Sequence, residues 1–388
     1  MSVIKETVEG FGFIDKENEE CLKTYLYEEA NYDLEKIVAE VEEKVVGQRD
    51  QIRRIVEYFC LWIDRRQRIR EGVDESELPR LSSIMLMGPT ASGKTYILRT
   101  VCKAMGLPLT VVSSTTLTGT GWRGSSVESE LLPVARTQEE NPDAVQVVLF
   151  DEFDKMRIDR RTEREYGGFN AQPSMLKLLD GGIYHAHDEN TRVSYDLDTS
   201  GVLFLFAGAF SGLGKRFVAP RLRKETYATG GTHDEAISAV AYSDDENLLR
   251  TQAKTIDLLH WGILSELTGR IGMIVPLPAL TEEQLIDVVN NSRCSLQNRF
   301  AAVMPPRVDF RIDDDAAHLL AQRAIASNLG ARALESEIVT YVSHAAQECR
   351  VNGEITQVTI TAVNDELQVE SASGEADKNN KKGESCEQ

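Results

Sequence analysis

The sequence lacks the features that define several classes of protein. No apolar run approaches the length that spans a bilayer, so we expect no transmembrane helix and no membrane partner. The opening MSVIKETVEGFGFIDKENEE has no basic segment followed by an apolar one, which is the pattern of a secretory signal. The six cysteines include no CxxC pair and no zinc-ligand spacing with histidine, which predicts reduced thiols without structural zinc. These absences together indicate a cytoplasmic protein.

Positive charge is also scarce. The formal net charge is −19, and the residues up to Lys44 include 13 acidic side chains against 5 lysines. Surfaces that bind nucleic acid are usually basic, so the composition does not favour a nucleic-acid partner, although RIDRRTER (157–164) is a local basic segment. We expect residues 1–40 to form an acidic N-terminal segment, and residues 370–388 to form a disordered tail because they are polar.

The hydrophobic pattern predicts an α/β fold with two domains. Apolar runs typical of buried strands alternate with helical periodicity and indicate a parallel five-stranded sheet; they lie at 81–88, 107–114, 144–151, 201–210 and 271–277. From Pro278 the sequence changes to amphipathic helices, with one short strand at 355–362. We therefore expect a large α/β domain over 41–277, with a polar exposed insertion at about 225–254. A small, mainly helical domain is expected over 278–369.

A glycine-rich segment follows the first apolar run. GPTASGKT (88–95) fits the pattern GxxxxGK[ST] and lies between a predicted strand and a predicted helix. Its backbone N–H groups would cradle the phosphates of ATP, Lys94 would reach the β and γ phosphates, and the Thr95 hydroxyl would ligate Mg²⁺. The predicted phosphate-binding residues are Gly88, Pro89, Thr90, Ala91, Ser92, Gly93, Lys94 and Thr95.

The third apolar run continues into VVLFDEFD (147–154), which ends in carboxylates. Asp151 would hold Mg²⁺ through its water shell, and Glu152 would act as the general base that polarises the attacking water. Phosphoryl transfer also needs positive charge close to the γ phosphate, which arginine can supply. Arg270 directly precedes the fifth predicted strand, and Arg332 lies at the start of a predicted helix in the small domain. Spacing alone leaves a structural ion pair as the commoner role for either arginine. The glycine-rich motif and the acidic motif together predict nucleotide hydrolysis.

Several motifs in a fixed order resemble those of AAA+ ATPases of the Clp/HslU group, and of the ClpX type of protein unfoldase in particular. The resemblance runs from about Val45 to Val363 and is based on VVGQ, GPTASGKT, VVLFDEFD, QPSMLKLLDGG, FLFAGAFSGL, LSELTGR and GARALES. It implies that Val45 and Val46 line the adenine pocket, that Arg270 is a finger acting on a neighbouring subunit, and that Arg332 contacts the γ phosphate of its own subunit. It also implies ATP and Mg²⁺ as cofactors, and a homo-hexamer that acts on protein substrates.

The segment GTGWRG aligns with the aromatic substrate-gripping loop of ClpX-type proteins. The resemblance implies that Gly121, Trp122, Arg123 and Gly124 form a pore loop, and apolar contact by Trp122 would grip a chain of any sequence. Arg123 stands where the family usually has an apolar residue, which suggests a preference for acidic substrate segments.

Other positions differ from the ClpX pattern. The chain has no cysteine pairs for a zinc module and no Ile-Gly-Phe tripeptide for docking on the peptidase ClpP, so we expect no ClpP partner. The fourth strand ends in small and apolar residues, so no residue there is assigned as a sensor. We expect an ATP-dependent unfoldase that threads polypeptide through its pore. A nucleic-acid motor, or an ATP-gated scaffold that recruits a partner protein, remains an alternative.

Overall fold

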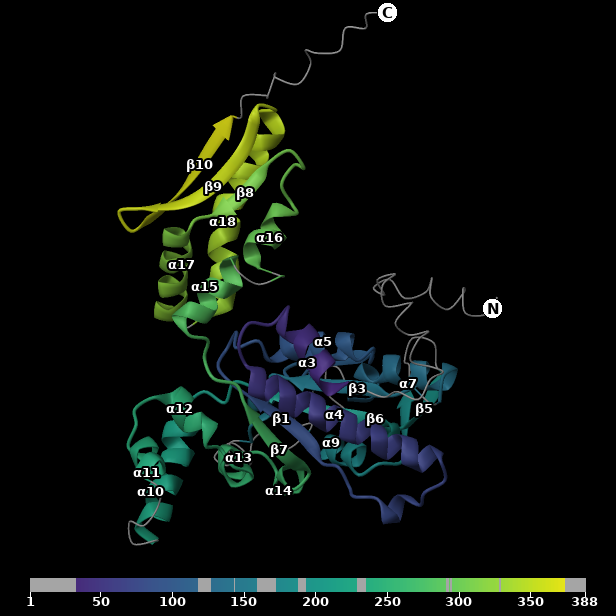
Figure 1. The fold of residues 1–388 in the computed structure, drawn as a ribbon. Coiled ribbons are helices and arrows are strands. Elements are labelled where there is room, and N and C mark those ends of the chain that lie inside the picture. Colours follow the sequence, from purple (N-terminus) through teal and green to yellow (C-terminus); the bar gives the residue numbers. More distant parts are fainter. Residues whose placement is uncertain are drawn as a thin grey trace, which may run out of the picture. The chain divides into compact units, whose positions relative to one another are not determined.

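The computed structural model describes residues 33–117, 127–142, 144–158, 172–187, 193–228, 235–290, 293, 295–327 and 329–373. The chain forms two compact units, the first ending at Ala279 and the second beginning at Leu280 (Figure 1). Within the described ranges, no helix is both long enough and apolar enough to cross a membrane.

The first unit is built on a parallel five-stranded sheet with the strand order β2-β3-β6-β1-β7. The central strands β3, β6 and β1 are buried along almost their whole length, as is usual for parallel strands with helices on both faces. The strands are β1 (Ser83–Met87), β2 (Leu109–Ser113), β3 (Gln146–Asp151), β6 (Val202–Gly208) and β7 (Ile271–Pro276). The sheet confirms the predicted α/β fold class.

Alternate side chains of the strands enter two different hydrophobic cores, because successive residues of a strand point to opposite faces. Ile84 and Leu86 of β1 join a core with α3 (Leu34–Glu42), α4 (Arg49–Arg70) and α5 (Lys94–Ala104), which Figure 1 shows beside one another. Met85 and Met87 join the other core, whose helices include α6 (Val127–Glu130), α7 (Leu132–Glu140), α9 (Gln172–Leu179), α13 (Thr255–Trp261) and α14 (Ser265–Thr268).

Helix α3 corrects the predicted start of the large domain. Its residues Ile37, Val38 and Val41 are buried in the core shared with α4 and α5, so the domain includes residues that composition assigned to an acidic N-terminal segment. The acidic side chains lie on the opposite side of an amphipathic helix, which a count of charge alone does not reveal. The Asp33 carboxylate caps this helix by accepting a hydrogen bond from the Lys36 N–H at 3.2 Å.

The predicted polar insertion at 225–254 contains helices, and a few of its residues are buried. It contains the end of α10 (Ala219–Ala228), α11 (Glu235–Ala241) and α12 (Glu246–Thr251), and both Ala241 and Leu249 are fully buried. The Glu246 carboxylate accepts hydrogen bonds from the N–H groups of Gly212, Gly214 and Lys215, at the start of the π-helical turn η4 (Gly214–Val218). Glu246, a polar residue of the segment 225–254, therefore forms hydrogen bonds within the fold and not only with solvent.

Shorter elements complete the first unit. The antiparallel hairpin of β4 (Ile183–His187) and β5 (Ser194–Asp198) is separate from the main sheet. The 3₁₀ turns among its described residues are η1 (Glu75–Glu77), η2 (Phe153–Met156) and η3 (Thr199–Gly201). Turn η2 directly follows the residue pair at the end of β3, which makes it part of the site described below.

In the described part of the second unit, four helices accompany a three-stranded sheet of order β10-β9-β8. Its elements are α15 (Glu282–Asn290), α16 (Leu296–Ala301), β8 (Asp309–Ile312), α17 (Asp314–Ala326), α18 (Ala331–Val351), β9 (Ile355–Val363) and β10 (Glu366–Ser373). The sequence predicted only one of these strands, and β10 continues into the predicted disordered tail. Strand β10 pairs with β9 and buries Leu367, although its exposed face is too polar to give a strong hydrophobic signal.

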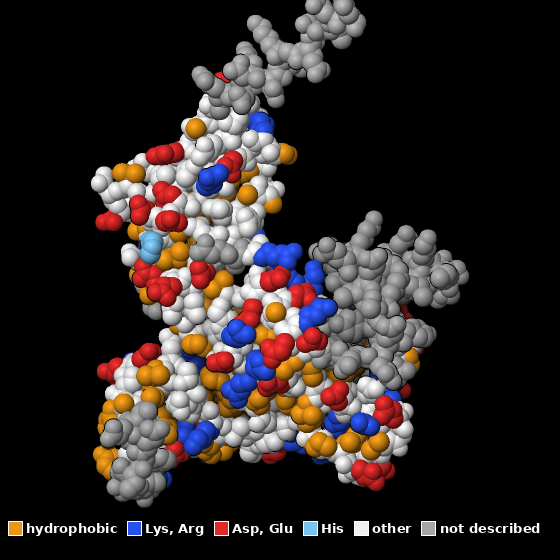
Figure 2. All heavy atoms as spheres, in the orientation of Figure 1, with side chains coloured by type: hydrophobic (Ala, Val, Ile, Leu, Met, Phe, Trp, Pro, Cys, Tyr) orange, Lys and Arg blue, Asp and Glu red, His pale blue; other side chains and the backbone are white. Residues whose placement is uncertain are grey.

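The surface of the first unit mixes charges of both signs. Figure 2 shows Lys and Arg side chains interspersed with Asp and Glu on the face that carries α4. Arg53 of this helix, for example, forms ion pairs with Glu35 at 2.6 Å and with Glu57 at 3.0 Å. The positive charge of Arg53 on this face is therefore balanced by neighbouring carboxylates.

Candidate active site

The glycine-rich segment forms the loop between β1 and α5. Ala91 and Gly93 have positive φ angles of 58° and 85°, so the loop turns sharply before α5 begins at Lys94. A Cβ atom on Gly88 would lie 2.6 Å from the carbonyl oxygen of Leu277, so only glycine fits there without a shift. The Lys94 ammonium donates hydrogen bonds to the carbonyl oxygens of Gly88 and Pro89 at 2.9 and 2.8 Å. The lysine therefore folds back over the loop that its motif predicts to hold phosphates.

The carboxylate at the end of β3 reaches this loop across the end of β6. Strand β6 lies between β1 and β3, and Thr95 Oγ1 donates a hydrogen bond to Asp151 Oδ2 at 2.5 Å. Hydroxyl and carboxylate oxygens are hard ligands that suit Mg²⁺, so this pair fits the predicted metal. No group of three His, Cys, Asp or Glu side chains in the described ranges could hold a metal alone. Mg²⁺ here would take further ligands from phosphate and water.

Glu152 has a left-handed backbone with a φ of 55°, which is uncommon for a residue with a side chain. Its N–H donates to Asp151 Oδ1 at 2.8 Å, and its side chain is exposed beside the predicted magnesium ligands. The next turn, η2, is fixed by Asp154, which is buried and accepts a hydrogen bond from the Ala209 N–H at 3.0 Å. Glu152 thus lies next to Asp151 at the end of β3, and its role as general base stays a prediction.

The segment that follows β6 contains no polar sensor side chain. It continues from Gly208, whose carbonyl accepts a hydrogen bond from the Gly88 N–H at 3.3 Å, to Ala209 and Phe210. Phe210 is fully buried with a φ of 47°, and its ring lies 5.7 Å from that of Trp261. The end of β6 therefore packs under the phosphate loop with main-chain and apolar groups.

The predicted adenine-binding pair lies in the connection between α3 and α4. Val45 is buried and Val46 is half-buried, and the Tyr96 hydroxyl of α5 donates a hydrogen bond to the Lys44 carbonyl oxygen at 3.2 Å. The next two residues, Gly47 and Gln48, both have positive φ angles. The structure thus places Val45 and Val46 next to the helix that begins in the phosphate loop.

Arg270 lies at the opposite edge of the sheet from the phosphate loop. Its carbonyl oxygen accepts a hydrogen bond from the Ser83 N–H at 2.8 Å, at the start of β1, whereas Gly88 follows the end of β1. The five residues of β1 span roughly 17 Å at ~3.3 Å per residue. Arg270 is therefore not placed to contact a phosphate in the loop of its own chain.

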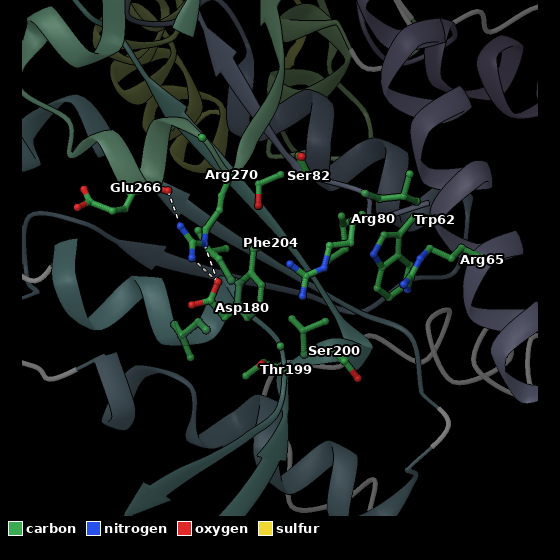
Figure 3. Close-up of a pocket in the computed structure, with 18 of the residues that line it drawn as sticks. Trp62, Arg65, Arg80, Ser82, Asp180, Thr199, Ser200, Phe204, Glu266 and Arg270 are labelled. Atoms are coloured by element: carbon green, nitrogen blue, oxygen red, sulfur yellow. Dashed lines mark hydrogen bonds and ion pairs between the residues drawn. The ribbon is translucent and has the colours of Figure 1, made fainter. Parts of the chain in front are cut away.

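The Arg270 guanidinium is held by Asp180, which directly follows α9, and by α14 (Figure 3). Nε donates to Asp180 Oδ1 at 2.8 Å, Nη2 also donates to this oxygen, and Nη1 donates to the Glu266 carbonyl oxygen at 2.7 Å. The group borders a cavity of about 450 Å³ that Trp62 and Arg80 also line. Sequence reasoning missed Asp180, because no local pattern connects it with an arginine 90 residues away.

The remaining predicted residues lie elsewhere in the chain. Arg332 is exposed in the first turn of α18, in the second unit. The predicted pore loop, Gly121 to Gly124, lies outside the described residues, as does most of the basic segment 157–164. Their roles stay predictions.

Comparisons with known proteins identify the family. Residues 84–208 match the ATPase family associated with various cellular activities (AAA), and residues 280–363 match the C-terminal, D2-small domain of ClpB protein. The chain is 30% identical over 317 residues to the ATP-dependent Clp protease ATP-binding subunit ClpX of Treponema denticola, covering 76% of this chain and 72% of the relative. The chain belongs to the AAA ATPase family. This AAA ATPase is a homologue of ClpX, which confirms the predicted resemblance and the prediction of ATP hydrolysis.

Proposed function

We propose that this AAA ATPase is a protein-unfolding motor that works as a homo-hexamer. The observation that supports a ring is the position of Arg270 at the sheet edge opposite its own phosphate loop. An arginine there can complete an ATP site only on another copy of the chain. A closed ring with head-to-tail contacts gives every copy such a neighbour.

The chemistry of one site follows from three elements of the first unit. The loop from Gly88 and the Lys94 ammonium bind the β and γ phosphates, and Thr95 and Asp151 hold Mg²⁺, which neutralises phosphate charge when bound. Glu152 accepts a proton from the attacking water as the oxygen of that water bonds to the γ phosphorus. The bond from the γ phosphorus to the bridging oxygen breaks, which yields ADP and phosphate.

Two arginines supply positive charge to the γ phosphate in this proposal. Arg270 acts on the site of the neighbouring subunit, and Arg332 on the site of its own chain. A guanidinium delivered in this way stabilises the charge that develops on the transferred group. Val45 and Val46 provide apolar contact for adenine beside α5.

Substrate handling is proposed from the resemblance to ClpX. Trp122 and its flanking Gly121, Arg123 and Gly124 would contact a polypeptide in the pore, and ATP hydrolysis would move these loops. The relative is named as a subunit of an ATP-dependent Clp protease. This chain has no Ile-Gly-Phe tripeptide, so we propose that it remodels proteins without ClpP.

A substrate trap in the host cell tests the proposal. Tagged Glu152→Gln should bind ATP, fail to hydrolyse it and retain gripped proteins, and the matched control carries Trp122→Ala in addition. Proteins that co-purify only when Trp122 is present would support threading through the pore. Recovery of nucleic acid, or of the same partner regardless of Trp122, would contradict it and favour a nucleic-acid motor or a scaffold.

A further inference from the structure

The first residue of α9, Gln172, is fully buried and uses both ends of its amide. Its Nε2 donates hydrogen bonds to the carbonyl oxygens of Met156 at 2.8 Å and of Gly262 at 3.2 Å. Its Oε1 accepts a hydrogen bond from the Leu264 N–H at 2.8 Å. One side chain thus joins two main-chain segments that are about 100 residues apart in the sequence.

One joined segment directly follows Glu152, the proposed general base, and the other precedes Arg270, the proposed arginine finger. Met156 is the last residue of η2, the turn that begins directly after Glu152. Gly262 and Leu264 form the short connection from α13 to α14, after which comes Arg270. Gln172 therefore connects the turn of the proposed general base with the helix that presents the proposed finger.

Further contacts make this connection tight. The Trp261 indole N–H donates to the Asp154 carbonyl oxygen at 3.2 Å, and the Ile158 N–H donates to the Gly262 carbonyl oxygen at 3.0 Å. A Cβ atom on Gly262 would lie 2.6 Å from the Ile158 carbonyl oxygen, so the two segments are in direct main-chain contact. Neither segment can shift far without moving the other or breaking these bonds.

Helix α9 reaches the finger at its other end as well. Asp180 directly follows Leu179, the last residue of α9, and its carboxylate accepts the hydrogen bonds from the Arg270 guanidinium. Helix α9 also packs against α14. The segment from Gln172 to Asp180 therefore contacts η2 at its first residue and Arg270 at its last.

We propose that Gln172 is a positioning residue that fixes the general-base turn and the arginine-finger helix relative to each other. The position of Glu152 in a subunit's own ATP site, and the position of the Arg270 that this subunit supplies to its neighbour's site, then depend on the same side chain. This inference rests on the proposed function, because it requires Glu152 to act within its own site and Arg270 to act on the next one.

The first test compares Gln172→Met with Gln138→Met. Gln138 is a matched control, because its buried amide also bonds main chain in both directions, to the Asp198 carbonyl oxygen at 3.0 Å and from the Asp198 N–H at 2.6 Å. It joins α7 to β5 and touches neither η2 nor α14. Since a misplacement of about 1 Å can cost ~100-fold in rate, we expect Gln172→Met to lower kcat by about 10- to 100-fold. The KM for ATP should stay nearly unchanged, because the phosphate loop is intact, and Gln138→Met should keep the wild-type kcat.

The second test uses mixed rings of Glu152→Gln and Arg270→Ala subunits, each inactive alone. Mixing them forms sites with an intact general base from one parent and an intact finger from the other, and ATPase activity should return. Gln172→Met is then placed in either parent. If Gln172 positions both groups, activity falls by about 10-fold or more in both mixtures. Gln138→Met in either parent should leave the recovered activity unchanged.

The outcomes separate the inference from the proposed function. No recovery in the parent mixture would contradict the trans role of Arg270 itself. If the parent mixture recovers ATPase activity but Gln172→Met lowers this activity in neither mixture, or in only one, the coupling is overturned. The trans role of Arg270 would then still stand. Should Gln172→Met fail to assemble by size-exclusion chromatography, Gln172→Glu replaces it. This variant keeps an oxygen for the Leu264 N–H and retains at most one donor, the proton of a buried carboxyl, for the Met156 and Gly262 carbonyl oxygens, and the same criteria apply.

Discussion

Replacement of Gly88 by alanine tests whether the phosphate loop is held as tightly as its contacts indicate. The added Cβ would lie 2.6 Å from the Leu277 carbonyl oxygen and 2.8 Å from Leu277 Cβ and Ser92 Oγ. Reaching ordinary contact, which begins at 3.4 Å, requires the loop or the Leu277 main chain to move by about 0.8 Å. Neither is free, because the Leu277 N–H donates to the Met87 carbonyl oxygen at 2.7 Å and the Gly88 carbonyl accepts from Lys94.

We expect this overpacking to cost about 1–3 kcal/mol, which lowers Tm by roughly 2–12 °C. A displacement of that size next to Lys94 should reduce ATPase turnover by up to about 100-fold. The assays are differential scanning calorimetry and steady-state ATP hydrolysis. Gly353→Ala is the matched control, because a Cβ at Gly353 would meet no atom within 4 Å. A Gly88→Ala protein with the Tm and turnover of the wild type would refute the steric argument.

Two further predictions concern the finger and a buried thiol. Arg270→Ala should lower ATP turnover by about 10³-fold or more without weakening ATP binding, measured by titration with a fluorescent nucleotide; a large loss of binding instead would argue for a role in its own site. Mixing it with Glu152→Gln should restore activity at about a quarter of the sites in randomly assembled rings. Burial raises the pKa of the Cys102 thiol from its ordinary value near 9 to about 12. The folded state therefore retains a proton that the unfolded state loses, so this stabilisation is present below about pH 9 and is lost as the pH rises toward 12. Urea unfolding at several alkaline pH values should show a shallower decline for Cys102→Ala, and an equal slope in both proteins would count against this origin.

Local patterns predicted most of the sheet and the phosphate loop. Strands such as β3 and β6 are continuous apolar runs because helices cover both of their faces. The loop from Gly88 to Thr95 is recognisable from its motif, and Gly93 meets a local requirement because it adopts a positive φ. The crowding at Gly88 comes mainly from Leu277, which is distant in the sequence, so it becomes visible only in the folded chain.

Composition was a weaker guide where polar residues belong to the fold. Acidic composition predicts a separate N-terminal segment where α3 lies, although the apolar side of this helix is buried in the core. Polar composition predicts a disordered tail that includes the end of β10, although this strand forms by pairing with β9. In both cases the stabilising partner is supplied by another element, and only part of the segment's surface is apolar.

Hydrophobic periodicity and the placement of glycines are local features, so the amino-acid sequence is enough to specify an α/β ATPase with a phosphate loop after its first sheet strand. Which distant groups meet depends on the tertiary structure. It placed Arg270 at the edge away from its own loop, paired it with Asp180, and joined η2 to the connection before α14 through Gln172. Single hydrogen bonds between a side chain and segments some 90 residues away impose no local pattern on the sequence, so they become visible only once the chain has folded.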